Sequence, residues 1–143
     1  MSQRIYVDAN VFINFLYENS THPDLVGASV TVLDDVIGCR FFLVVSDFLV
    51  REISKVTGLE YDLIEGRLFE PYRMVDKLEF VRLSQGDGLD VTAFSSGYGV
   101  HPVDAVHAVL AMNNGCWLVT FDGDLKVAAG RAGFMVFDPR DLL

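Results

Sequence analysis

The sequence contains no apolar run that approaches the roughly 20 residues of a membrane-spanning helix, which argues against a protein embedded in a membrane. No secretory pattern is recognisable at the start, because Asp8 interrupts the only apolar segment there and no small-residue cleavage site follows. Internal repeats, linkers and low-complexity tracts are also absent. We therefore expect residues 1–143 to form a single domain in the cytoplasm.

Cysteine is scarce, with only Cys39 and Cys116 in the chain. Two isolated cysteines make neither a zinc motif nor the disulfide framework of a small secreted domain. Both lie beside apolar stretches, so we expect two buried free thiols in a reducing compartment.

Positive charge is in short supply as well. The chain has 11 lysines and arginines against 20 acidic residues, for a formal net charge of −9. Its overall field therefore repels nucleic acids and anionic membranes. Six of the basic residues fall between positions 51 and 82, but seven acids share that stretch, which predicts a mixed surface. A nucleic-acid function would need local cations, a basic partner or bound metal ions.

Apolar residues, in contrast, are abundant at 51% of the chain, which suggests a patch buried against a partner or a second copy. Strand-length apolar runs recur at Ile5–Val7, Phe41–Val45, Leu78–Leu83, Trp117–Thr120 and Phe134–Phe137. Helical patterns lie between them at Val11–Tyr17, Asp24–Ile37, Phe48–Val56, Leu63–Val75, Val91–Ser96 and Val103–Met112. Stop or turn signals include Gly38, Gly58, Gly86-Asp87-Gly88, Asn113-Asn114-Gly115 and Gly130. This alternation predicts an α/β/α domain with a mostly parallel sheet.

Acidic residues follow the predicted strands at positions that should meet. Asp8 ends the first strand and Asp122 ends the fourth, while Asp104 opens a helix just after Pro102, which suits a first helical turn. In a parallel sheet the strand ends and the starts of the following helices share one edge, where ligands bind. Three carboxylates from distant segments are therefore expected at one place.

Glu52 is expected to join them. It follows Ser46, a good N-cap residue, and lies about 9 Å up the predicted helix. Helical side chains lean toward the N terminus, so the longer glutamate can reach back to the strand edge. Taken singly, each acid has an ordinary explanation as a cap, a helix-dipole partner or a solvated residue; in this view Asp124 caps the short helix after Asp122.

The convergence of these acids indicates a metal site. Two carboxylates 4 Å apart repel by about 4 kcal/mol at an effective dielectric near 20, and a divalent cation relieves that cost. An oxygen-only set without a cysteine or histidine cluster favours Mg²⁺ or Mn²⁺ over Zn²⁺. His107 lies three residues after Asp104, and a histidine packed at the rim of the core is favoured over a role beside the metal.

Four blocks resemble the PIN domain family, the metal-dependent nuclease fold that includes VapC-type toxins. They span essentially the whole chain: Val7-Asp8-Ala9-Asn10-Val11-Phe12, Val45-Ser46-Asp47-Phe48-Leu49-Val50-Arg51-Glu52-Ile53, Tyr98-Gly99-Val100-His101-Pro102-Val103-Asp104-Ala105-Val106-His107-Ala108 and Leu118-Val119-Thr120-Phe121-Asp122-Gly123-Asp124-Leu125. Each block alone is a weak pattern, but all four in order make a strong one.

The resemblance implies a five-stranded parallel sheet of order 3-2-1-4-5 and metal-dependent hydrolysis of RNA, usually by a homodimer. It implies an acidic quartet that is both catalytic and metal-binding: Asp8, Glu52, Asp104 and Asp122. Asn10, Thr120 and Asp124 match supporting polar positions, and Asp124 is a further candidate metal ligand. A small antitoxin protein is the partner implied for a toxin.

Several alternatives stay open at this point. A phosphotransferase of the haloacid-dehalogenase type would want an aspartate where Asn10 stands, and both that class and receiver domains would want a late lysine near the acids. A PIN-like scaffold that binds RNA or protein without cutting remains a rival, as does a nuclease of RNA processing or maturation. Metal-dependent cleavage of RNA would separate the enzyme from the scaffold.

Overall fold

The structure, a computed structural model, describes residues 2–17 and 22–143. Within these residues five strands form one parallel sheet in the order β3-β2-β1-β4-β5, which confirms the expected order. The strands are β1 (Gln3–Val7), β2 (Phe41–Ser46), β3 (Leu78–Val81), β4 (Trp117–Val119) and β5 (Val136–Phe137). Because all of them run in one direction, the sheet has a carboxyl edge, where every strand ends, and an amino edge, where every strand begins.

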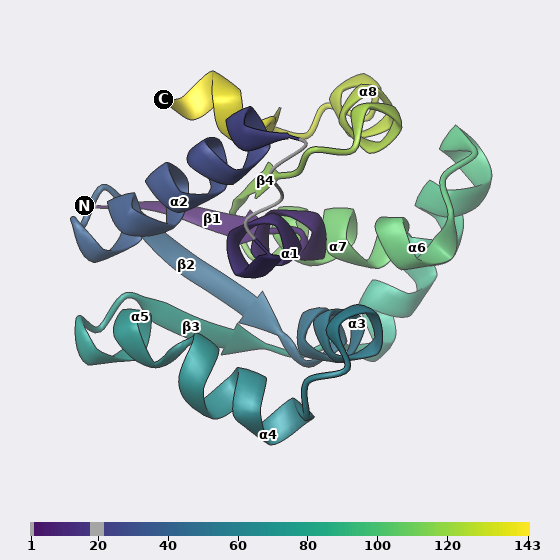
Figure 1. Cartoon of the computed structure of the whole chain (residues 1–143). Helices are drawn as coiled ribbons and strands as arrows, with labels where there is room; N and C mark the ends of the chain where they lie inside the picture. The colour runs from purple at the N-terminus through teal and green to yellow at the C-terminus, as the bar shows by residue number, and fades with distance from the viewer. Residues whose placement is uncertain (1, 18–21) are drawn as a thin grey trace.

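Helices flank the sheet on both faces, as expected for right-handed crossovers in a parallel sheet (Figure 1). On one side α1 packs against α2 and α3, and on the other α6 packs against α7, which contacts β1 and β4. The helices are α1 (Ala9–Tyr17), α2 (Pro23–Ile37), α3 (Asp47–Thr57), α4 (Tyr61–Leu63), α5 (Glu70–Met74), α6 (Gln85–Tyr98), α7 (Pro102–Asn113) and α8 (Gly123–Arg131). A short 3₁₀ turn, Pro139–Leu142, closes the chain.

Oxygen-bearing side chains begin the helices at the carboxyl edge. Ser46 accepts a hydrogen bond from the Leu49 N–H at 3.0 Å, as its predicted cap position requires. Ser84 accepts from the Asp87 N–H, and Asp122 accepts at the start of α8. These oxygens satisfy N–H groups that the first turn of a helix leaves without a partner.

The amino edge is built by backbone conformation instead. Each of its four helix-to-strand turns contains one residue in the left-handed region: Cys39 before β2 (φ 66°), Asp76 before β3 (56°), Gly115 before β4 (66°) and Gly133 before β5 (86°). This conformation reverses the chain sharply after a helix and is disfavoured for residues with a Cβ.

Two segments differ from the sequence expectation. The single helix expected over Leu63–Val75 is divided into α4, a π-helical turn at Ile64–Leu68 and α5, with Pro71 in the first turn of the last. The expected turn at Gly86-Asp87-Gly88 is wrong, because these residues form the first turn of α6. There Ser84 and Asp87 cap each other reciprocally, which offsets the low helix propensity of the two glycines.

The expectation of two buried thiols is half wrong. Cys116 is buried at the start of β4, but Cys39 is exposed. The left-handed backbone at Cys39 carries the chain around the end of α2, so its side chain lies outside the core.

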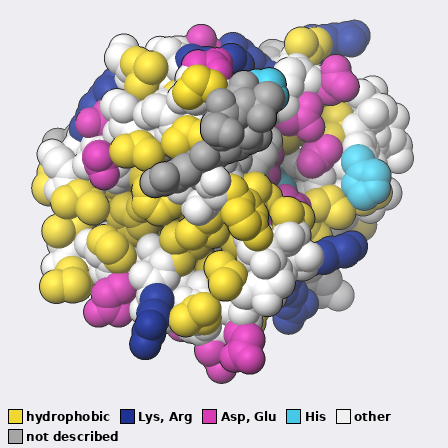
Figure 2. Space-filling model, viewed as in Figure 1, with side chains coloured by type: hydrophobic (Ala, Val, Ile, Leu, Met, Phe, Trp, Pro, Cys, Tyr) yellow, Lys and Arg dark blue, Asp and Glu magenta, His cyan; other side chains and the backbone are white. Residues whose placement is uncertain are grey.

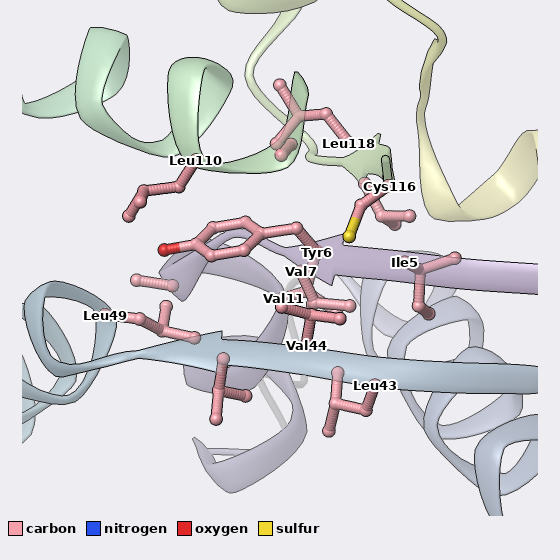
Figure 3. Packing of buried hydrophobic residues seen from close by; sticks show 14 of the residues in the cluster. Ile5, Tyr6, Val7, Val11, Leu43, Val44, Leu49, Leu110, Cys116 and Leu118 are labelled. Atoms are coloured by element: carbon pink, nitrogen blue, oxygen red, sulfur yellow. The ribbon is translucent and has the colours of Figure 1, made fainter. Parts of the chain in front are cut away.

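The core is centred on β1, which has neighbours on both sides and helices on both faces (Figure 3). Ile5, Tyr6 and Val7 are completely buried, and the ring of Tyr6 lies between β1 and α7, close to Leu110. In the described part of the chain no helix has the length and apolarity to cross a membrane.

Candidate metal centre

Acidic side chains gather at the carboxyl edge of the sheet. Figure 2 shows them around a recess between α8, α6 and α3. At its base Asp8 follows β1 directly, and its backbone N–H donates to the Val119 carbonyl of β4 at 2.9 Å. The pairing of β1 with β4 therefore brings the segments that end in Asp8 and Asp122 side by side.

Asp8 is nearly enclosed, at 3% exposed. Its Oδ1 accepts the Ala9 N–H at 2.7 Å, and its Oδ2 accepts the Thr120 hydroxyl at 2.8 Å and an amide N–H of Asn10 at 3.3 Å. Burial raises the pKa of Asp8, and the Glu52 carboxylate adds to the rise, while His107 and the Thr120 hydroxyl oppose it. The hydrogen bonds thus fix the carboxyl group in place, and its raised pKa means that the surroundings disfavour its charged form.

Asn10 and Thr120 join the ends of the two central strands. Thr120 Oγ1 accepts the Asp122 N–H at 3.0 Å and an amide N–H of Asn10 at 3.2 Å. Asn10 Oδ1 accepts the Phe121 N–H, also at 3.2 Å. These two polar side chains hold the β1 and β4 ends in register around Asp8.

His107 and Glu52 form the other side of the cluster. His107 Nε2 lies 3.0 Å from Glu52 Oε2 and 3.8 Å from Asp8 Oδ1. One ligand atom from each of Asp8, Glu52 and His107 falls within 4.8 Å of the others. Glu52 therefore does reach back from the second turn of α3 to the strand edge, as its position predicted.

The expectation of His107 at the rim of the core is wrong, because its side chain is completely buried beside the acids. Nδ1 lies 2.8 Å from the Tyr6 hydroxyl, which in turn lies 2.6 Å from Ser46 Oγ. Burial alone would lower the pKa of His107, but the hydrogen bond to Glu52 and the Asp8 charge outweigh it and raise the pKa. The two signals in the sequence were the spacing from Asp104 and a tyrosine hydroxyl within an apolar strand.

Asp104 and Asp122 share the electrostatic field of this cluster. Asp104 is half-buried in the first turn of α7. Burial raises its pKa, and the charges of Asp8, Asp122 and Glu52 raise it further. The other three members of the predicted quartet thus act on the Asp104 carboxyl group, although the tight contact in the described residues is between Asp8, Glu52 and His107.

Asp122 is also the N-cap of α8. Its Oδ1 accepts the N–H groups of Asp124 at 3.0 Å and Leu125 at 3.2 Å. The expectation that Asp124 caps this helix is therefore wrong; Asp124 is an exposed residue of the first turn. Its carboxylate lines the recess on the α8 side.

The donor set fits a divalent cation. Four carboxylates lie at one edge of the sheet, and the raised pKa values of Asp8 and Asp104 reflect burial and mutual repulsion that a cation would relieve. Oxygen donors of this kind suit Mg²⁺ or Mn²⁺, whereas the single histidine, already hydrogen-bonded on both ring nitrogens, gives no zinc-like set.

Comparison with known proteins agrees with this geometry. The family model for the PIN domain matches residues 5–131. No curated protein gives a significant match.

Among solved structures, FitAcB from Neisseria gonorrhoeae is similar with a TM-score of 0.68 at 16% identity, covering 95% of this chain and 98% of that chain. A toxin-antitoxin complex from Klebsiella pneumoniae matches with a TM-score of 0.60 at 16% identity, covering 94% and 97%. Mycobacterium tuberculosis VapC20, a toxin that cleaves the sarcin-ricin loop, matches with a TM-score of 0.60 at 13% identity, covering 91% and 95%. At these identities the likeness concerns the fold.

Proposed function

The chain belongs to the PIN domain family, and from this we propose that it is a ribonuclease that depends on Mg²⁺ or Mn²⁺ and serves as the toxin of a toxin–antitoxin pair. PIN domains are nucleases. The observation that carries the proposal for this chain is the convergence of Asp8, Glu52, Asp104 and Asp122 at the carboxyl edge.

We assign the metal to Asp8, Asp104 and Asp122, with Glu52 binding directly or through water and Asp124 beside them. A divalent ion bound there would lower the pKa of a water molecule and would stabilise the negative charge that develops on the phosphate. Hydrogen bonds from Asn10 and Thr120 fix the position of the Asp8 carboxylate before a metal ion or substrate binds.

The reaction is hydrolysis of a phosphodiester. Water attacks the phosphorus, the bond from phosphorus to the 3′ oxygen breaks, and the products carry a 5′-phosphate and a 3′-hydroxyl. We assign Glu52 to take the proton of the water; its Oε2 is engaged by His107, and its Oε1 has no hydrogen-bond partner among the described residues.

Cleavage of a labelled single-stranded RNA by the purified protein tests this proposal. Cleavage is expected with Mg²⁺ or Mn²⁺, to stop with a chelator and to return when the ion is restored. Asp8→Asn should abolish cleavage and leave the protein folded, which circular dichroism checks, because the amide is nearly isosteric with the carboxylate that it replaces. A folded Asp8→Asn protein that cuts RNA at the wild-type rate contradicts the assignment.

The toxin role is supported by the similar structure of a toxin-antitoxin complex and by VapC20. A small partner with a basic segment would complement the acidic recess, and a homodimer would cover exposed apolar residues. Expression of the chain with its neighbouring gene tests the role. Arrested growth that the neighbouring product relieves, with co-purification of the two, is expected of a toxin and not of a processing nuclease.

A further inference from the structure

Two grooves flank the candidate metal centre along the carboxyl edge. The α8 groove, with a volume of about 390 Å³, has Tyr98, His101, Asp104, Asp122, Asp124 and Arg131 among its lining residues. The β3 groove, with a volume of about 550 Å³, includes Ser46, Phe48, Arg51, Tyr61, Phe80 and Arg82. We propose that these grooves bind single-stranded RNA on either side of the cleaved bond, which rests on the ribonuclease function proposed above.

The topology places the two grooves and the centre in a row. The β3 groove lies where β2 and β3 end, the acids lie at the ends of β1 and β4, and the α8 groove lies beyond them between α7 and α8. The α8 groove shares Asp104 and Asp122 with the centre. On the other side, the ring of Phe48 packs edge-on against His107 with centroids 5.8 Å apart. A strand crossing the centre therefore enters both grooves.

Each groove contains an arginine that is free to bind phosphate. Within the described residues six of the lysines and arginines pair with acids: Arg4, Arg40, Arg51, Arg73, Lys126 and Arg140. Arg82 and Arg131 pair with none of the described acids, and both are exposed on groove walls. On a chain with a net charge of −9, these positions supply the local cations that RNA binding requires.

His101 adds a donor to the α8 groove. Its Nδ1 accepts the Val103 N–H at 3.2 Å, so in the neutral ring the proton is on Nε2. That N–H is available to a phosphate or a 2′-hydroxyl group.

Aromatic rings on the same walls favour unpaired bases. Tyr98 is 41% exposed and packs against Phe94 with ring centroids 5.3 Å apart, so part of its side chain remains accessible to a base. Phe48, Tyr61 and Phe80 line the β3 groove. Stacking on aromatic rings requires bases that are not paired in a duplex, so the walls select single strands.

Steady-state cleavage at several salt concentrations tests the proposal. The variants are Arg82→Gln and Arg131→Gln, and the matched control is Arg67→Gln, which removes an exposed arginine that lines neither groove. On an oligoribonucleotide long enough to span both grooves, each groove variant should raise KM several-fold with kcat unchanged. The slope of log kcat/KM against log salt should become shallower by about 0.7 for each phosphate that a variant no longer neutralises, and the control should match the wild type.

Substrate form and length separate the possible outcomes. The wild type should cut the single strand faster than the same sequence in a duplex, and the groove variants should behave like the wild type on a dinucleotide. Groove variants that match the Arg67→Gln control on the long substrate overturn this inference, as does equal cleavage of the duplex. A wild-type protein that cuts no RNA with either metal overturns the proposed function itself, which is a different result.

Discussion

At the amino edge of the sheet each helix-to-strand turn depends on one left-handed residue, whereas at the carboxyl edge the strand-to-helix turns are closed by Asp8, Ser46, Ser84 and Asp122. The turns at the amino edge satisfy C=O groups at helix ends, and those at the carboxyl edge satisfy N–H groups at helix starts, so only the second edge concentrates side-chain oxygens. The carboxyl edge is suited to a cation site because the residues that begin its helices lie close together.

The sharpest test of this comparison separates capping from metal binding at Asp122. Asp122→Ser keeps an N-cap oxygen, and Asp122→Ala removes it. Both should lower metal-dependent cleavage by more than about 100-fold, since neither supplies a carboxylate. Only the alanine variant should also lose about 1 kcal/mol of unfolding free energy.

Urea denaturation and RNA cleavage measure the two effects independently. Asp62→Ser, which changes an exposed acid of α4, is the control and should behave as the wild type. An active Asp122→Ser enzyme would show that Asp122 only caps the helix.

A second test concerns the positioning of Glu52. His107→Gln retains a side-chain N–H near the Nε2 position, and His107→Asn retains one near Nδ1, where Tyr6 is the partner. We expect His107→Asn to lower cleavage by about 10- to 100-fold because it removes the hydrogen bond to Glu52, and His107→Gln to lower it less. Equal rates for the two variants in folded proteins would remove the positioning role.

At the amino edge, changes should affect stability alone. Gly115→Ala places a Cβ on a left-handed residue with no atoms within 4 Å of it, so the cost is purely conformational, about 1 kcal/mol. Cys39→Gly removes that strain but loosens the unfolded chain, so its net effect should stay within about 0.5 kcal/mol. Neither should change the cleavage rate, and a slower Gly115→Ala enzyme would mean that the two edges are coupled.

The smallest expected effect is the pH response of the Ser84–Asp87 capping box. Hydrogen bonds from the Ser84 N–H and the Asn113 amide lower the pKa of Asp87 below its usual range. Its stabilisation is therefore complete above the unfolded-state pKa of about 3.9 and is lost as pH falls through the lower folded-state pKa. The stability difference between wild type and Asp87→Asn should be constant from neutral pH to about pH 4 and shrink below it.

The convergence of the four acids follows from features that are local in the sequence, whereas the order of the strands was predicted only through the resemblance to the PIN family. Asp8 and Asp122 come directly after apolar runs, and Pro102 marks the helix start that places Asp104. Parallel topology then determines which edge these residues share. The apolar spacing likewise predicted α1, α2, α3 and α7, but only part of α6.

The remaining features depend on contacts between distant residues. The Tyr6 hydroxyl meets His107 across 101 positions of sequence, so the local spacing from Asp104 was not enough to place the histidine in the cluster. The glycines beside Asp87 favour a turn, and only the reciprocal bonds with Ser84 and the contact with Asn113 make them helical. Cys39 has apolar neighbours in sequence, but its left-handed backbone turns it outward.

That outward turn gives the molecule a natural point of attachment. Burial raises the pKa of the Cys116 thiol to about 11, so this sulfur resists alkylation at neutral pH, whereas Cys39 is accessible. A maleimide fluorophore would therefore couple at Cys39, which lies at the amino edge of the sheet, opposite the carboxyl edge that carries the acids. Such a conjugate would report the arrival of substrate or partner by anisotropy without an engineered cysteine.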